Sequence, residues 1–149
     1  MKFIADVMLG RLAKRMRLLG IDVLYDRTLD DNEIIRLSLE QERAILTRDR
    51  ALSDRPLAAN HLLIKSELVR QQVEQVLSAF PLESKLHPLS RCSGCNEPLV
   101  RIAREEARDL VPQYVYEHKD LFLRCPRCRR TYWHGTHVRR MVLPEQTIN

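Results

Sequence analysis

Lys2-Phe3-Ile4-Ala5-Asp6 and Ala44-Ile45-Leu46-Thr47-Arg48-Asp49 share one pattern, in which a short apolar run ends close to a carboxylate. Runs of this length, rich in aliphatic residues, are typical of strands buried on both faces. After the first run, apolar residues recur at helical spacing from Leu9 to Leu19, and Gly20 is a natural stop after a helix. The two stretches therefore predict strands of a parallel sheet joined through helices.

The same alternation continues along residues 1–88. Further short apolar runs are separated by stretches in which apolar residues fall on one face of a helix. Repeated alternation of this kind predicts an α/β fold, with a compact parallel sheet, right-handed crossovers and flanking helices. The expected strands lie at 2–5, 22–25, 44–47 and 62–64. The expected helices run from Leu9 to Leu19, from Asp30 or Asp31 to about Glu42, and from a cap at Ser66 to a point before Pro81.

Acidic residues follow the first three expected strands, as Asp6, as Asp30 or Asp31, and as Asp49. Because the carboxyl ends of parallel strands meet at one edge of a sheet, we expect these carboxylates to converge there. Clustered carboxylates are the hard oxygen ligands that Mg²⁺ and Mn²⁺ prefer, and such ions support phosphodiester hydrolysis. Spacing alone also allows the acids to be simple helix caps.

A phosphoacceptor receiver domain is the rival interpretation of this acidic edge. Its site requires an acidic pair after the first strand and a lysine after the last one. Lys65 fits the second requirement, but Val7 stands where a second acid is expected. The sequence therefore favours the metal site over the receiver domain.

All four cysteines lie in the last third of the chain, as Cys92-Ser93-Gly94-Cys95 and Cys125-Pro126-Arg127-Cys128. Two such pairs can complete a tetrahedral shell around one zinc ion, although the 29 residues between them exceed the usual spacing. Disulfides suit secreted proteins, but Asp6 interrupts the first apolar run before a signal core could form. We therefore predict a nuclease-type domain at residues 1–88 and a zinc ribbon at residues 89–149.

The charge of the chain is uneven. The net charge is +5, and residues 89–149 carry 11 Lys and Arg against 7 Asp and Glu. Arginines surround the second cysteine pair, and Tyr132 and Trp133 follow, which suits phosphate binding and base stacking on a single-stranded nucleic acid. The aromatic residues could equally pack the ribbon, with the arginines forming a solvated face. No apolar run has the length of a membrane span, so we expect a soluble, cytoplasmic protein.

Several stretches, taken together and in order, closely resemble the Mut-seven C-terminal RNase family. The resemblance covers nearly the whole chain, and it implies a compact PIN-like nuclease domain with an attached zinc ribbon and metal-dependent cleavage of RNA. The stretches are Phe3-Ile4-Ala5-Asp6, Leu9-Gly10-Arg11-Leu12-Ala13, Leu18-Leu19-Gly20, Asp30-Asp31, Ile45-Leu46-Thr47-Arg48-Asp49, Arg91-Cys92 and Tyr132-Trp133-His134-Gly135-Thr136-His137.

The resemblance assigns roles by position. Asp6, Asp31 and Asp49 match the acidic motifs of the catalytic Mg²⁺ or Mn²⁺ centre, with Asp30 as the nearest substitute for Asp31. A typical PIN domain has a fourth acidic position, for which Asp54 is the candidate here. Cys92, Cys95, Cys125 and Cys128 match the zinc ligands.

The expected RNA contacts follow from position in the sequence, beside the acids or near the second cysteine pair. They are Arg11, Lys14, Arg48, Arg127, Arg129, Trp133 and His137.

The expected function is a Mg²⁺- or Mn²⁺-dependent ribonuclease that cuts single-stranded RNA endonucleolytically. One alternative is a non-catalytic RNA-binding or adaptor protein that uses the ribbon. Another is a toxin-like nuclease that a regulatory protein partner holds inactive. The sequence leaves the RNA target, the number of catalytic ions and the oligomeric state open.

Overall fold

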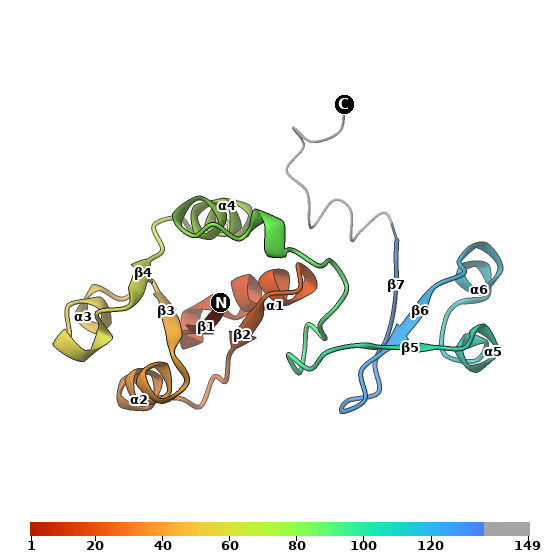
Figure 1. The fold of residues 1–149 in the computed structure, drawn as a ribbon, viewed down its shortest axis with the longest axis horizontal. Helices are drawn as coiled ribbons and strands as arrows, with labels where there is room; N and C mark the ends of the chain where they lie inside the picture. Colours follow the sequence, from red (N-terminus) through yellow and green to blue (C-terminus); the bar gives the residue numbers. More distant parts are fainter. Residues whose placement is uncertain (136–149) are drawn as a thin grey trace.

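The structure is a computed structural model that describes residues 1–135. Figure 1 shows two sheets at the two ends of the long axis of the molecule, one in the first half of the chain and one in the second. The first sheet has four parallel strands in the order β2-β1-β3-β4, and the second has three antiparallel strands. The first four strands are β1 (Lys2–Ala5), β2 (Asp22–Leu24), β3 (Arg43–Thr47) and β4 (His61–Leu63).

Helices cover both faces of the parallel sheet (Figure 1). Because successive side chains of a strand point to opposite faces, Phe3 and Ala5 join the apolar cluster under α1 and α4, whereas Ile4 joins the cluster under α2. Ile45 of β3 lies on the α2 side, and Leu46 lies on the other. The helices are α1 (Gly10–Leu18), α2 (Asp31–Gln41), the short α3 (Arg50–Ser53) and α4 (Val69–Ala79).

The predicted parallel α/β fold is confirmed, with small differences at the ends of elements. β2 ends at Leu24, and the Tyr25 side chain instead donates a hydrogen bond to the Val7 carbonyl at 3.0 Å. A 3₁₀ turn, η1 (Val7–Leu9), precedes α1. Two more 3₁₀ turns are η2 (Pro56–Ala58) and η3 (Glu83–Lys85).

Ser66 was expected to cap α4, and that prediction is wrong. The helix begins after Leu68, which offers no side-chain cap. The Ser66 hydroxyl accepts the Leu68 amide at 3.0 Å and donates to Gln71 at 2.6 Å, so it closes a local turn before the helix. A serine directly before an apolar helical run can form such a turn as readily as a cap.

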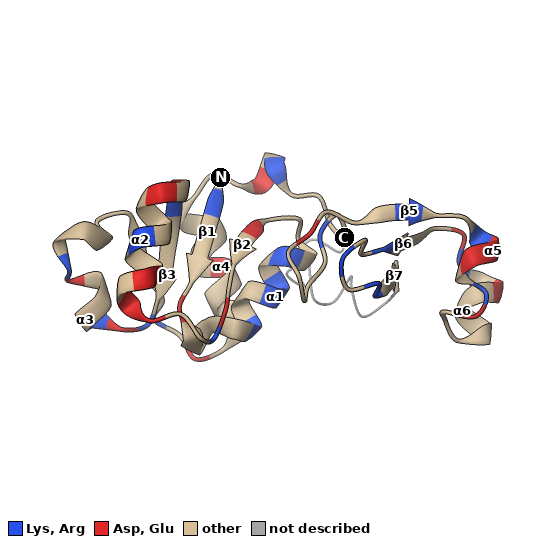
Figure 2. Cartoon of the chain, turned by 90° about the horizontal axis from the view of Figure 1, so that it is seen from below, with Lys and Arg blue, Asp and Glu red and all other residues tan. Residues whose placement is uncertain are grey.

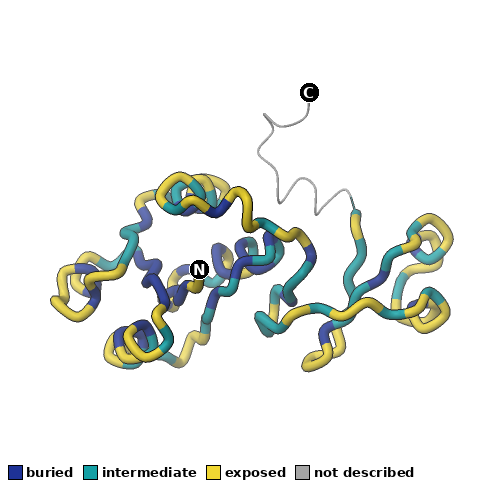
Figure 3. Tube along the Cα trace, in the orientation of Figure 1, coloured by how far each residue is buried: buried dark blue, intermediate teal, exposed yellow. Residues whose placement is uncertain are grey.

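The segment between the two cysteine pairs is long because it contains folded structure. The antiparallel sheet is β5 (Val100–Ile102), β6 (Phe122–Arg124) and β7 (Thr131–Trp133), and α5 (Arg104–Ala107) and α6 (Gln113–His118) lie between β5 and β6. Ala107, Val115 and Phe122 form a small buried cluster there. Figure 3 shows far less buried chain in this part than around the parallel sheet.

Buried Arg17 joins the two parts of the chain. Only 4% of its surface is exposed, and its guanidinium donates to the Val23 carbonyl at 2.9 Å. The same group donates to the carbonyls of Ser93 and Gly94, at 3.0 and 3.1 Å. One side chain therefore links the end of α1, strand β2 and the first cysteine pair.

Asn96 extends this junction along β2, which is an edge strand of the parallel sheet. Its side chain accepts the Val23 amide at 3.1 Å and donates to Asp22 at 2.7 Å, so it pairs polar groups that an edge strand otherwise exposes. Arg43 also pairs with Asp22, at 2.8 Å. Burial raises the pKa of Asp22, but the hydrogen bonds from Arg43 and Asn96 outweigh burial and hold that pKa below its usual value.

The chain after α4 returns along the end of α1. The amides of His87 and Leu89 donate to the carbonyls of Leu19 and Leu18, both at 2.9 Å. Gly20 makes this approach possible, because its φ is +87° and a Cβ there would lie 2.4 Å from the His87 carbonyl oxygen. The division at residues 88 and 89 stays a prediction. Within residues 1–135, no helix is long and apolar enough to cross a bilayer.

We predict that Arg17→Met destabilises the protein by about 2–4 kcal/mol, because the buried Val23 carbonyl and the part-buried carbonyls of Ser93 and Gly94 lose a charged donor. Urea unfolding followed by circular dichroism measures the change. Arg11→Met is the matched control, since Arg11 is exposed on the same helix and should change stability by less than about 0.5 kcal/mol. Equal stability of the two variants would contradict the role of Arg17.

Candidate functional site

Asp6 follows β1 directly and lies at the carboxyl edge of the parallel sheet, where it is 4% exposed. Its backbone amide donates to the Leu46 carbonyl at 3.0 Å, which ties it to β3. Its Oδ1 accepts the Met8 amide at 2.9 Å, and its Oδ2 accepts the Thr47 hydroxyl. The residues that the structure describes give Asp6 no ion pair, so a cation at this edge would offset the cost of its burial.

Thr47 connects the first and third predicted acids. Its fully buried hydroxyl donates to Asp6 and accepts the Asp49 amide at 2.9 Å. Asp49 is the N-cap of α3, and its Oδ1 accepts the Ala51 amide at 2.8 Å. Asp6 and Asp49 therefore belong to one hydrogen-bonded unit at the strand ends, and each also acts as a cap.

The structure separates the roles of Asp30 and Asp31. Asp30 is the N-cap of α2 and forms a capping box with Glu33, in which both hydrogen bonds measure 2.8 Å. Asp31 is the exposed first residue of the helix and is not part of this box. Its carboxylate is therefore better suited than that of Asp30 to bind an ion.

The three acids do not form a closed metal cage in this structure. Within residues 1–135, the four cysteines are the one group of three or more ligating side chains gathered closely enough to hold an ion. Asp6 and Asp49 are both hydrogen-bonded to the Thr47 hydroxyl. Asp31 is outside this network, at the start of α2. The arrangement resembles an open carboxylate edge more than a preformed site.

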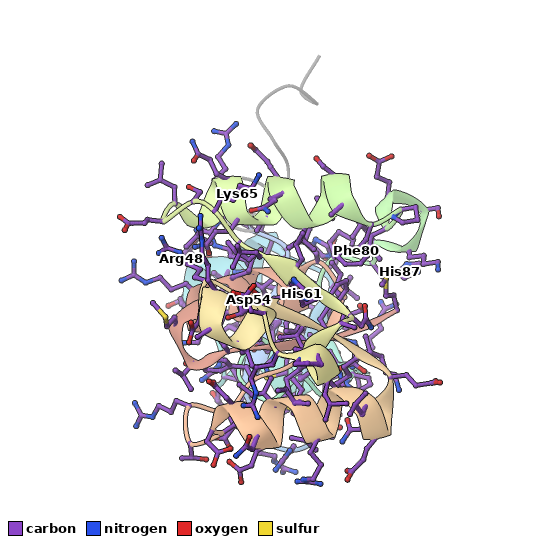
Figure 4. All side chains as sticks on the ribbon, turned by 90° about the vertical axis from the view of Figure 1, so that its left-hand side faces the viewer. Arg48, Asp54, His61, Lys65, Phe80 and His87 are labelled. Carbon is purple, nitrogen blue, oxygen red and sulfur yellow. The ribbon has the colours of Figure 1, made fainter. Side chains whose placement is uncertain are left out.

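A cleft of about 370 Å³ opens beside this edge, between the start of α1 and the start of α4. Arg11 and Arg48, both predicted to contact RNA, line it together with Gln72. Arg48 extends toward the segment before α4, on the side where Figure 4 also shows Lys65, and lies 3.6 Å from exposed Glu67. Two guanidinium groups thus border an open cleft next to Asp6, which is a suitable arrangement for binding phosphate.

Asp54, the candidate for the fourth acid, lies at the opposite end of α3 from Asp49. It is the exposed C-cap of α3, and this helix packs against β4. Figure 4 shows Asp54 close to His61 of β4. No hydrogen bond or ion pair among the described residues connects its carboxylate with Asp6 or Asp49.

The four cysteines come together as predicted. Their sulfur atoms all lie within 4.8 Å of one another, and the sulfurs of Cys92 and Cys128 are 3.6 Å apart. Tetrahedral bonds from zinc to thiolates of about 2.3 Å require sulfur atoms roughly 3.8 Å apart, so the set fits such an ion. The amides of Cys95 and Cys128 donate to the sulfurs of Cys92 and Cys125, both at 3.4 Å. The cluster can therefore bind a metal ion such as zinc.

The Tyr132 side chain contacts the cysteine cluster, a role that the sequence did not reveal. Its hydroxyl lies 3.1 Å from the Cys92 sulfur and accepts the Ser93 amide at 3.0 Å. Burial raises the pKa of Cys92, but hydrogen bonds from Tyr132 and from the Cys95 and Gly94 amides lower it to about 6. Burial and the neighbouring sulfurs raise the pKa of Cys95 to about 12. A divalent cation would relieve this conflict between adjacent thiolates.

The remaining predicted RNA contacts have different surroundings. Arg127 is exposed and lies 3.8 Å from Glu97, and Arg129 is exposed with a φ of +68°. Lys14 is exposed on α1. Trp133 is half-buried and packs against the Phe122 cluster of the ribbon, which matches the packing alternative. His137 lies outside the described residues.

Two functional candidates emerge only from the structure, Thr47 and Tyr132. Each is a polar side chain next to predicted functional residues, and each was present in the motifs that carry the family resemblance. Hydroxyl groups at such positions give no signal of their own in the sequence, because Thr is common in strands and Tyr is common in small cores. Their partners become visible only when the strands are paired.

The structure thus combines a parallel α/β sheet that has an acidic edge with an antiparallel sheet and a cluster of four cysteines. Residues 1–144 match the Mut7-C RNAse domain family. The chain therefore belongs to this family, and membership indicates a nuclease function with RNA as substrate. No curated protein and no solved structure matches the chain.

We predict that Tyr132→Phe lowers zinc affinity about 10–100-fold, because the variant loses the hydroxyl that supports the Cys92 thiolate. Competition with a chromogenic chelator measures the affinity. Tyr114→Phe is the matched control, since Tyr114 is exposed on α6. Unchanged affinity in Tyr132→Phe would show that the contact does not support metal binding.

Proposed function

We propose that this protein is a PIN-like endoribonuclease that uses Mg²⁺ or Mn²⁺ to hydrolyse phosphodiester bonds of single-stranded RNA. The observation that carries the proposal is the Asp6–Thr47–Asp49 unit at the carboxyl edge of the sheet, next to a cleft lined by Arg11 and Arg48. Family membership supports the reaction class. The open edge supports endonucleolytic cleavage, because no feature of the cleft requires a free RNA end.

Asp6, Asp49 and Asp31 are the residues that would hold the catalytic ions. Such ions stabilise charge on the phosphodiester and lower the pKa of bound water. Hydrogen bonds from neutral groups fix the Asp6 carboxylate at the strand end, and the cap of α3 fixes Asp49. Asp31 stands on a separate helix, so the site is completed from two directions around the substrate.

Arg11 and Arg48 are the proposed phosphate-binding groups. Both reach the cleft from elements that follow a strand end, so they lie close to the acids. Glu67 is 84% exposed opposite Arg48, and an ion pair that is open to water at 3.6 Å is weak. An RNA phosphate can therefore displace Glu67 at little cost.

We propose that the cysteines bind structural zinc and that the ribbon, from residue 89 onward, adds RNA-binding surface. The small cluster around Phe122 supports a structural role, because so few buried residues rarely stabilise a fold alone. The cysteines form no disulfide, which fits a reducing compartment such as the cytoplasm.

The central prediction is that the parent protein cuts circular single-stranded RNA in Mn²⁺ or Mg²⁺ and not in EDTA. Asp6→Asn should lower kcat by about 10²–10³-fold, because the metal centre supplies several kcal/mol of transition-state stabilisation. Denaturing gels of circular and end-labelled linear RNA follow the products. Asp54→Asn is the matched control and should keep near-parental activity.

Each possible result has a definite meaning. If Asp6→Asn cuts RNA as fast as the parent, the proposed catalytic site is wrong. If the parent cuts linear RNA alone, the endonucleolytic mode is wrong. If neither protein cuts RNA and both bind it tightly, the RNA-binding alternative replaces the nuclease.

A second prediction concerns Thr47 as a positioning residue. Thr47→Val keeps the shape of the side chain but removes the hydroxyl between Asp6 and Asp49, so it should raise the Mn²⁺ concentration needed for half-maximal activity about tenfold. Thr47→Ser retains the hydroxyl and should stay within about threefold of the parent. Titration of cleavage rate with Mn²⁺ separates metal affinity from kcat, and equal curves for the two variants would rule the role out.

A further inference from the structure

The exposed face of α1 begins at the proposed active edge and ends at the ribbon. Arg11 and Lys14 are three residues apart and lie on one face of the helix, whereas Leu12, Ala13 and Met16 face the core. Arg11 lines the cleft beside Asp6. The nine residues of α1 span about 14 Å, so the helix leads from the cleft to the junction with the ribbon.

The far end of α1 contacts the first cysteine pair. Arg17 donates to the carbonyls of Ser93 and Gly94 and holds this loop against the helix. Gly94 in turn lies against Arg130, because a Cβ placed on Gly94 would be 2.8 Å from an Arg130 guanidinium nitrogen. These contacts therefore connect α1, through Gly94, with Arg130 next to the second cysteine pair.

The charged side chains in the chain segments along this path are basic. Residues 7–21, 89–96 and 125–135 contain basic side chains and no aspartate or glutamate. Figure 2 shows lysines and arginines on α1 and also on the turn that precedes β7. A zinc ion with four thiolates has a formal charge of −2, and buried Arg17 lies next to it and offsets part of that charge. Lys14 and Arg130 are both exposed to an external polyanion, and the Arg130 guanidinium also interacts with the Tyr132 hydroxyl.

We propose that a single RNA strand runs from the acidic edge along α1 and across Gly94 to Arg130, so that both parts of the protein bind the same strand. This path, the α1–ribbon track, is defined by Arg11, Lys14 and Arg130, and it rests on the proposed function. The backbone phosphates are the groups recognised, because the track offers cations at intervals.

The track makes RNA length a determinant of affinity. An RNA of about 4 nucleotides can occupy the acidic edge without reaching the ribbon, whereas one of about 16 nucleotides can span both parts. Neutralising Arg130 should therefore weaken only the longer RNA. Neutralising Lys14, in the middle of the track, should weaken the longer RNA as well.

The test measures binding of both RNAs to Asp6→Asn protein, in which cleavage is suppressed, over a range of salt concentrations. Lys14→Gln and Arg130→Gln should each lower the slope of log affinity against log salt by about 0.7 for the long RNA. Arg101→Gln is the matched control, because Arg101 is exposed on β5 and is not a residue of the track. Its slope should equal that of the background protein.

Arg130 also lies close to the cysteine cluster, so its charge and its local contacts must be separated. Arg130→Lys keeps the charge and should retain most of the salt dependence, and the zinc content of every variant is measured alongside binding. If Arg130→Gln binds zinc normally and binds the long RNA as tightly as the background protein, the track is wrong.

Photo-crosslinking shows whether one strand reaches both points. A crosslinker at position 14 and another at position 130 should capture different nucleotides of the same end-labelled RNA, in a fixed order. Capture of the same nucleotide from both positions, or capture from position 14 alone, would overturn the track. These outcomes are independent of cleavage by Asp6→Asn, so failure of the track and failure of the nuclease can be told apart.

Discussion

The parallel pairing of β1 with β3 is the contact on which the rest of the structure depends. It places Ile4 opposite Ile45 and Ala5 opposite Leu46, and these residues fill the two apolar clusters on either face of the sheet. The same register brings Asp6 next to Thr47 at the end of the strands. Core packing and the acidic edge are thus consequences of one alignment, and a shift by one residue would lose both.

The ribbon is attached through polar groups instead of a shared apolar core. Arg17 and Asn96 supply hydrogen bonds to strand β2 and to the first cysteine loop, and they complete the edge of the parallel sheet. Such contacts are directional, so they fix how the ribbon sits relative to α1. The second cysteine pair lies against the first in the four-cysteine cluster, in which all four sulfurs come together.

The proposed site combines stable and open elements. Asp6 and Thr47 are buried at the carboxyl ends of β1 and β3, whereas Asp31 is exposed and half-buried Arg48 lines an open cleft. Buried groups hold a fixed geometry, and exposed groups can adjust to a substrate. This division suits a protein that binds a flexible polymer, because the buried Asp6 carboxylate stays in place while exposed side chains accommodate different strands.

The sequence by itself determined the alternation of strands and helices, the order of the acids and the two cysteine pairs, because these features repeat at spacings set by local geometry. The prediction from sequence misplaced the start of α4. It also left Asp30 and Asp31 interchangeable, because an aspartate that caps a helix and an aspartate that binds a metal ion cannot be distinguished from the sequence alone. Only the tertiary structure decided that Thr47 joins Asp6 to Asp49, that Tyr132 supports Cys92, and that Arg17 connects the two parts. These contacts join residues far apart in the chain, and local spacing carries no information about which distant groups meet.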